Sequence, residues 1–449
     1  MVEGHTVRIG CGSAYADDDL ELAMDMLERG DIDYLAMDSL AERTLGLAQL
    51  RRRLDPSSGF DERLPEIAER VLPLALDRGV KVIGNMGAAN PEGAGEFVAK
   101  AMHLHHPGVR IAVIRGDDVL QFLKDEDPTI EETGGRASAL DGEIVSANAY
   151  LGCESIVSAL ADGAQIVIGG RIADPSLFVG PLAYEFGWSV TDWPAMGRAT
   201  CIAHLLECGV YVTGGNYADP PFTPDFSLDS PSFPLASVRP DGSARIEKLS
   251  ATGGLMSSMT CKLQLGYEIH DPRAYLTPDV SADFSNVGLV EEGGGVIVSG
   301  ATGNERPPRL KVLVGVRQGY IGEGQVSFAG PGALERAQLA RATVRRKVDR
   351  LLDNGDISEV RYDLLGLDSI HGAATPSTAP SPYELHLRVA ARASDAKVAA
   401  KVALAVEHLQ LFGPAGTSGH RRLVRPVLAM YTTFVDRSRV SEAVQMLET

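Results

Sequence analysis

The stretch that decides the fold is residues 81–116, KVIGNMGAANPEGAGEFVAKAMHLHHPGVRIAVIRG. Its apolar start and the run RIAVIRG at 110–116 are typical of buried strands, and EGAGEFVAKAMHLH between them is typical of a helix. A strand, a helix and a second strand in this order form a parallel pair joined by a crossover helix. This stretch therefore predicts an α/β fold.

The same alternation continues on both sides of this stretch. Strands are predicted at VRIGCGSA, YLAMDS, SANAYLG and QIVIGGRIADP, residues 7–14, 34–39, 146–152 and 165–175. Helical patterns follow the first two, and another helix is expected from about Asp61 to Arg78. We therefore expect residues 1–225 to form a mostly parallel, doubly wound, Rossmann-like sheet with helices on both faces.

The pattern changes at about Pro220. PPFTPDFSLDSPSFP, residues 220–234, predicts a linker or a long loop, and ASVRPDGSARIEKL predicts a hairpin with Asp-Gly at its turn. Further strands then alternate with helical patterns at 333–353 and 394–412. We expect residues 226–449 to form an α+β sandwich domain of the split β-α-β kind, with one antiparallel sheet and one helical layer.

Charge and composition exclude several classes of protein. The chain has 449 residues, a formal net charge of −18 and a pI near 5.0, which opposes binding to nucleic acid or to anionic membranes. The five cysteines are scattered and fit a reduced protein. No leader pattern stands at the N-terminus, and no apolar run approaches the ~18 residues of a membrane span. We expect a cytoplasmic protein.

Polar residues follow the predicted strands in the first half. In parallel sheets the binding crevice lies beyond the carboxyl ends of the strands, so these side chains are expected to line one pocket. Each of them alone is more typical of a helix cap or a turn. The set comprises Ser13, Asp17, Asp38, Glu42, Arg43, Asn85, Asn90, Arg171, Asp174, Asn216 and Asp219.

The segment CIAHLLECGVYVTGGNYADPPF, residues 201–222, is the strongest candidate site. Helical spacing places His204, Glu207 and Cys208 on one face, and VYVT predicts a short strand after them. Gly214 and Gly215 would then let backbone amides approach a ligand. A buried structural histidine and an ordinary glycine turn are the alternatives. No metal is expected, because no paired cysteine motif or second histidine cluster supports one.

A nucleotide-binding motif is weaker. Gly10 and Gly12 follow an apolar run and precede a helix, but Tyr15 stands where the third glycine of the dinucleotide fingerprint belongs. An NAD-dependent oxidoreductase is therefore an alternative that rests on this loop alone.

Six segments run in order along the chain: GNMGAANP (84–91), GGRIADPSL (169–177), AHLLECGVYVTGGNYADP (203–220), SATGGLMSSMTCKLQLGYEIHDPRAYLTPDVSADF (250–284), LKVLVGVRQGYIGEG (310–324) and GPAGTSG (413–419). Taken together, these segments resemble the acyclic terpene utilisation proteins of the AtuA-like type. In relatives a small residue and a glycine pair tend to replace Met86, Gly87 and Ala88.

The resemblance implies catabolism of branched terpenoids through CoA thioesters. We expect a lyase, either a hydratase or a carbon-carbon lyase, acting on a branched acyl-CoA or a similar organic acid, with no cofactor besides the CoA moiety of the substrate. Both reactions need a base near the carbon α to a carbonyl and donors for the enolate oxygen. The expected base is Glu207 or Asp174, with His204 as its proton partner and Arg171 holding a carboxylate. The expected oxyanion donors are the amides of Gly214, Gly215, Gly253 and Gly254, and Asn85, Asn90, Asn216 and Asp219 are expected to bind substrate.

The resemblance also bears on partners. Many relatives carry a C-terminal ferredoxin-like extension, whereas this sequence stops soon after VLAMYTTFVDRSRV. The competing hypothesis is thus a non-catalytic acyl-binding subunit that works with a separate small ferredoxin-like protein. We expect a homo-oligomer, with a partner surface near residues 431–435.

Overall fold

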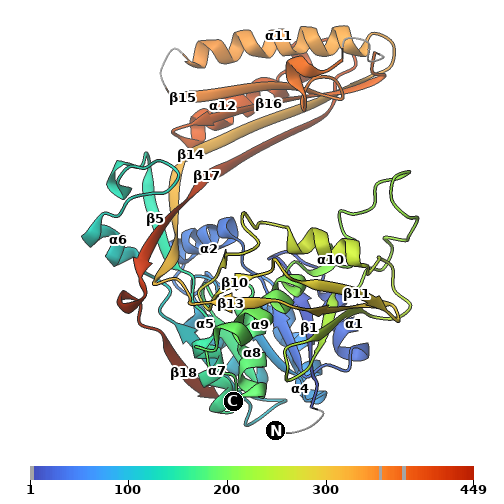
Figure 1. Cartoon of the computed structure of the whole chain (residues 1–449). Coiled ribbons are helices and arrows are strands. Elements are labelled where there is room, and N and C mark those ends of the chain that lie inside the picture. Colours follow the sequence, from blue (N-terminus) through green and yellow to red (C-terminus); the bar gives the residue numbers. More distant parts are fainter. Residues whose placement is uncertain (1–4, 353–355, 377–380) are drawn as a thin grey trace. The chain divides into compact units, whose positions relative to one another are not determined.

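The computed structural model describes residues 5–352, 356–376 and 381–449 (Figure 1). It contains two compact units. The first comprises Met1–Ala139, Val145–Val314 and Met430–Thr449, and the second comprises Leu140–Ile144 and Gly315–Ala429. The expected boundary between residues 225 and 226 lies inside the first unit, because the strands after it join the same sheet as the strands before it.

A ten-stranded mixed sheet forms the centre of the first unit. Five neighbouring strands are parallel, in the order β1 (Val7–Ser13), β2 (Tyr34–Met37), β3 (Lys81–Gly84), β6 (Ile166–Gly169) and β4 (Arg110–Arg115). Antiparallel strands extend both edges: β7 (Pro234–Val238), β8 (Ala244–Lys248), β12 (Gly295–Ser299) and β11 (Gly288–Glu292) beyond β1, and β18 (Ala443–Glu448) beyond β4.

The parallel strands alternate with helices, as their sequence pattern predicts. Asp19 caps α1 by accepting from the amide of Glu21, and Asn90 caps α5 by accepting from the amide of Gly93. The helices of the first unit that lie between Leu20 and Leu265 are α1 (Leu20–Arg29), α2 (Glu42–Leu54), α3 (Leu64–Glu66), α4 (Leu72–Asp77), α5 (Pro91–Met102), α6 (Leu120–Glu126), α7 (Glu154–Ala161), α8 (Ser176–Phe186), α9 (Trp193–Glu207) and α10 (Ser258–Leu265).

The helix expected from Asp61 to Arg78 is present but not uniform. A π-helical turn, η1 (Ile67–Val71), lies between α3 and α4. Pro73 has no amide hydrogen to donate to the carbonyl four residues earlier, and the wider turn before it accommodates that loss. Short 3-10 turns occur at η2 (Ala137–Ala139), η3 (Gly209–Tyr211), η4 (Gly372–Ala374) and η5 (Arg437–Arg439).

Several expectations for the first unit are wrong. The strand expected at 146–152 is β5 (Glu143–Ala149), which pairs with β14 and not with the parallel strands. VYVT, residues 210–213, lies in η3 and a turn, because the glycines around it favour turns over an extended chain. Residues 220–234 are not a link between units, since they lead directly into β7. The hairpin at 236–249 is confirmed as β7 and β8, but it extends the first sheet.

A small sheet completes the first unit. Its strands run in the order β13 (Thr302–Asn304), β10 (Ser281–Asp283) and β9 (Tyr275–Leu276). Gly197 of α9 packs so closely on β13 that an added Cβ would lie 2.0 Å from the carbonyl oxygen of Thr302. This contact fixes the first turns of α9 against the small sheet, and His204 in the last turn packs on Tyr275 of β9. Among the described residues, no helix combines the length and apolar character needed to cross a membrane.

The second unit is an antiparallel sheet with helices, as expected. Its sheet has the order β15, β16, β14, β17, and α11 and α12 contribute to one core with β14 to β16. Strand, helix, two strands, helix and strand in this chain order form the split β-α-β arrangement. The helix expected at 333–353 ends at Leu352, and residue 353 lies outside the described residues. The elements are β14 (Arg309–Ala329), α11 (Ala333–Leu352), β15 (Ile357–Leu365), β16 (Glu384–Ala393), α12 (Ala396–Glu407), α13 (Leu409–Phe412) and β17 (Ser418–Asp436).

Candidate functional site

Arg171 is the centre of the candidate site. It follows β6 at the carboxyl end of the parallel strands, and only 1% of its surface is exposed. Its guanidinium Nη1 lies 3.0 Å from Asp174 Oδ1 and donates to the carbonyl of Leu40 at 2.5 Å. The guanidinium also stacks on the ring of Tyr150, with Cζ 4.0 Å from the ring centroid. Burial alone would lower the pKa of Arg171, but the surrounding acidic groups raise it, so the side chain stays charged.

Asp38 and Asn85 form a buried polar pair beside Arg171. Asn85 Nδ2 donates to Asp38 Oδ1 at 2.7 Å, and Asn85 Oδ1 accepts from the amide of Ser39 at 2.7 Å. Burial raises the pKa of Asp38, and the charge of Asp174 raises it further, whereas Arg171 lowers it. Asn85 is fully buried, and its hydrogen bond with the amide of Ser39 holds the loop after β2 in place.

Asp174 differs from these groups because its side chain is about one third exposed, at 34%. Burial raises the pKa of Asp174 to about 6, with Arg171 opposing the shift and the charges of Glu207 and Glu42 adding to it. A carboxylate with a pKa near the working pH is suited to accept and return a proton. Asp174 is the strongest candidate base among the residues predicted from sequence.

His204 and Glu207 lie together on α9, as the helical spacing predicts. His204 Nδ1 and Glu207 Oε1 are 2.7 Å apart, and the two residues are 1% and 7% exposed. The ring of His204 packs against Tyr275 and Phe284, with centroid distances of 5.1 and 6.0 Å. Their remaining polar atoms, His204 Nε2 and Glu207 Oε2, have no hydrogen-bond partner among the described residues. The pair is buried and does not line the cavity described next.

A cavity of about 500 Å³ opens beside Asp174. Its polar wall contains Glu42, Tyr150, Arg171 and Lys311, and its apolar wall includes Ile269, Leu276 and Phe434. Tyr150 donates to Glu42 Oε1 at 2.9 Å, and Lys311 Nζ lies 3.7 Å from the same oxygen. The cavity therefore joins a charged, hydrogen-bonded end to an apolar wall, which is typical of small-molecule binding sites.

The predicted polar set is only partly brought together. Asp38, Glu42, Arg171 and Asp174 converge, with Asn85 behind them. Asn90 caps α5 and donates to the carbonyls of Pro56 and Ser58. The other members lie outside the cavity: Asp17, Arg43, Asn216 and Asp219 are exposed, and Ser13 accepts from Arg63 Nη2 at 3.2 Å.

The glycine amides expected to stabilise an oxyanion already donate within the fold. Gly214 donates to the carbonyl of Tyr211 at 3.3 Å and Gly215 to that of Val210 at 2.8 Å. The amides of Gly253 and Gly254 donate to the carbonyls of Ser230 and Ser227, at 2.9 and 2.7 Å. These glycines also let segments approach closely, since a Cβ on Gly253 would lie 2.1 Å from the carbonyl oxygen of Asp229. Their conformational freedom serves packing.

The glycines of the incomplete nucleotide motif lie within β1 and not in a loop after it. A Cβ on Gly10 would lie 2.8 Å from Met26 Cγ, and one on Gly12 would lie 2.6 Å from Met37 Sδ. They are small because helix α1 and strand β2 pack against them. The NAD alternative thus loses its supporting motif.

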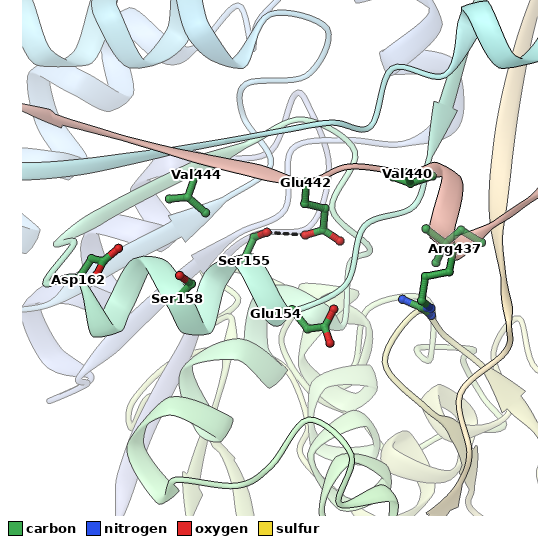
Figure 2. Close-up of a pocket in the computed structure, with 9 residues that line it drawn as sticks. Glu154, Ser155, Ser158, Asp162, Arg437, Val440, Glu442 and Val444 are labelled. Carbon is green, nitrogen blue, oxygen red and sulfur yellow. Dashed lines mark hydrogen bonds between the residues drawn. The ribbon is translucent and has the colours of Figure 1, made fainter.

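A second hollow, of about 560 Å³, lies beside the C-terminal segment (Figure 2). Ser155 donates to Glu442 in its wall, and Glu154 pairs at 2.9 Å with Arg306, which lies outside it. Arg437 donates to the carbonyls of Pro278 and Pro307, which are residues of the Asp174 cavity wall. Although this hollow has the larger volume, its contacts hold the C-terminal segment against neighbouring elements. The Asp174 cavity is therefore the better candidate site.

The segment 431–435 is not an exposed rim. Thr433 and Val435 are each 1% exposed, and Phe434 lines the Asp174 cavity, stacked under Arg309. Sequence reasoning missed the cavity residues Tyr150, Tyr275 and Lys311. Tyr150 could have been found, because it lies near the carboxyl end of the predicted strand SANAYLG.

Comparison with known proteins identifies one family. The family model described as acyclic terpene utilisation family protein AtuA matches residues 7–446. No curated protein and no solved structure was found to match the chain.

Proposed function

The chain belongs to the acyclic terpene utilisation family AtuA, and from its site we propose that it is a lyase of branched organic acids or their thioesters. The proposed reaction is removal of a proton α to a carbonyl, followed by loss of water or cleavage of a carbon-carbon bond. The observation that carries this proposal is a half-buried carboxylate, Asp174, with a pKa raised to about 6, at the charged end of a partly apolar cavity.

Each part of the cavity has a role in this proposal. Asp174 accepts the α proton, and Arg171 keeps it oriented through the 3.0 Å contact. The positive charges of Arg171 and Lys311 favour the negative charge that develops on the enolate oxygen. Ile269, Leu276 and Phe434 offer an apolar wall to a branched carbon chain. His204 and Glu207 do not line the cavity, but the charge of Glu207 helps to raise the pKa of Asp174.

The test is Asp174→Asn, assayed on a panel of branched 3-hydroxy acids and their N-acetylcysteamine thioesters, with alkene and cleavage products followed by NMR. Loss of the base should lower the rate by about 10²–10⁴-fold. The exposed Asp225→Asn is the matched control and should keep full activity. A wild-type protein that turns over no member of the panel, or a fully active Asp174→Asn, contradicts the proposal.

The pH dependence provides a second check. Asp174 must be deprotonated to act as a base, so kcat/KM should rise with pH through about 6 and then level off. The acyl-binding subunit remains the competing proposal. It predicts that the thioesters bind without turnover until a small partner protein is added.

A further inference from the structure

Tyr275 shares the cavity with Asp174. It lies on β9, where its backbone pairs with Ala282 of β10. Its ring packs against His204 and Phe284, with centroids 5.1 and 5.7 Å away. The ring is thus held on two sides while the residue still reaches the cavity.

The hydroxyl of Tyr275 is free for a ligand. No hydrogen bond among the described residues involves it, whereas the hydroxyl of the neighbouring Tyr150 donates to Glu42 at 2.9 Å. Tyr275 is partly exposed in the wall of the cavity, so a bound substrate can supply the hydrogen-bond partner that this hydroxyl lacks.

The surroundings of Tyr275 keep its proton in place. Burial raises its pKa, and the charges of Glu207 and Asp174 raise it further. Asp174 and Tyr275 therefore differ in protonation, since Asp174 loses its proton near pH 6, whereas the raised pKa of Tyr275 keeps its phenol protonated there. Pairs of groups separated in this way divide the roles of base and acid between them.

We propose that Tyr275 is the general acid of the site, which protonates the leaving hydroxyl group while Asp174 removes the α proton. This inference rests on the proposed function and selects its hydro-lyase form. The substrate class is a branched 3-hydroxyacyl compound, because that class places a leaving oxygen on the carbon next to the acidic one.

The step balances without a further reactant. The carboxylate of Asp174 takes the α proton, and the electron pair of the broken C–H bond forms the enolate. The enolate electrons then form the new C=C bond as the C–O bond at the β carbon breaks. The departing hydroxyl takes the phenolic proton of Tyr275 and leaves as water. Proton transfer through solvent from Asp174 to the phenolate restores both groups, and the reverse sequence hydrates the alkene.

The test separates the two steps. For the panel thioester that the wild type converts fastest, NMR in D₂O measures both exchange of the α proton and formation of the alkene. Tyr275→Phe should lose about 10²–10⁴-fold in alkene formation but keep α exchange, because only the acid is missing. Asp174→Asn should lose both. Tyr267→Phe, which is 38% exposed and outside the cavity, should keep both.

The outcomes are distinguishable. Full alkene formation by Tyr275→Phe overturns this inference and leaves the proposed base in place. Equal loss of exchange and elimination in a folded Tyr275→Phe assigns Tyr275 to binding and also overturns it. Both steps unchanged in Asp174→Asn, or absent in the wild type, overturn the proposed function itself. Thermal melting of each variant shows that a loss of rate is not a loss of folding.

Discussion

At the scale of single residues, the site is governed by charges around one buried guanidinium. Arg171 lies beside Asp38, Glu42 and Asp174, and the pKa values of these carboxyl groups shift in different directions. Burial raises the pKa of Asp38 and Asp174, and neighbouring negative charges raise it further. Glu42, held by Arg171, Tyr150 and Lys311, has a lowered pKa despite its desolvation. The pKa of Asp174 is shifted the other way, which is why we propose Asp174 as the proton acceptor.

Glu207→Gln tests this tuning directly. The amide keeps a hydrogen-bonding oxygen near His204 but removes a negative charge that raises the pKa of Asp174. The acid limb of the pH–rate profile should therefore move below about 6, while kcat at high pH changes little. The exposed Glu21→Gln should leave the limb in place. An unmoved limb in Glu207→Gln means that Glu207 does not influence the base.

Arg171→Met tests the role of the guanidinium in folding. The variant leaves buried carboxylates without their cation, which typically costs about 3–5 kcal/mol. The free energy of unfolding in urea should fall by about this amount, whereas the exposed Arg43→Met should change it by less than ~0.5 kcal/mol. Equal stability of the two variants would show that the carboxylates do not depend on Arg171.

At the scale of elements, periodicity predicted the helices and most parallel strands, because buried faces impose a regular apolar pattern. It could not predict which strands pair. The hairpin of β7 and β8 looks the same in sequence whether it starts a new domain or extends an old sheet. Gly214 and Gly215 illustrate a second limit of sequence-based prediction. A glycine pair fits both a ligand-binding loop and a tight turn, and only the hydrogen-bond partners of its amides distinguish the two.

Gly322 of β14 provides a test of packing between elements. A Cβ there would lie 1.9 Å from the carbonyl oxygen of Ala399 in α12, and a backbone atom cannot give way like a side chain. Gly322→Ala should destabilise the second unit by at least the ~1–3 kcal/mol typical of overpacking. Gly135→Ala, whose nearest neighbour would be 3.5 Å away, is the control for glycine replacement. Calorimetry showing equal melting temperatures would contradict this account.

At the scale of the whole molecule, the sequence indicated two parts but not their connection. A composition change at Pro220 marks only irregular chain within the first unit, and nearly all of the second unit is inserted between Val314 and Met430. Insertions are hard to recognise in a single sequence, because the local pattern of a strand does not say to which core it belongs. The expected oligomer and the small partner protein stay predictions, for which light scattering and co-expression are the measurements.

Substitutions in strand β18 test whether the two units unfold independently. Val444 packs against the first core and Gln445 beside it is exposed. Val444→Lys should therefore lower the melting temperature of the first unit and leave that of the second unit unchanged, whereas Gln445→Lys should alter neither. A shift of both transitions by Val444→Lys would mean that the two units unfold together.

The pairing of β18 with β4 also has a consequence for biosynthesis. Residues 315–429, which hold nearly all of the inserted unit, leave the ribosome before the strand that completes the sheet begun by β1. During translation the inserted unit can finish folding before β18 is available to pair with the edge of β4. An unpaired strand edge is a site for wrong association, so this edge is where a nascent chain is most exposed to aggregation and to chaperones.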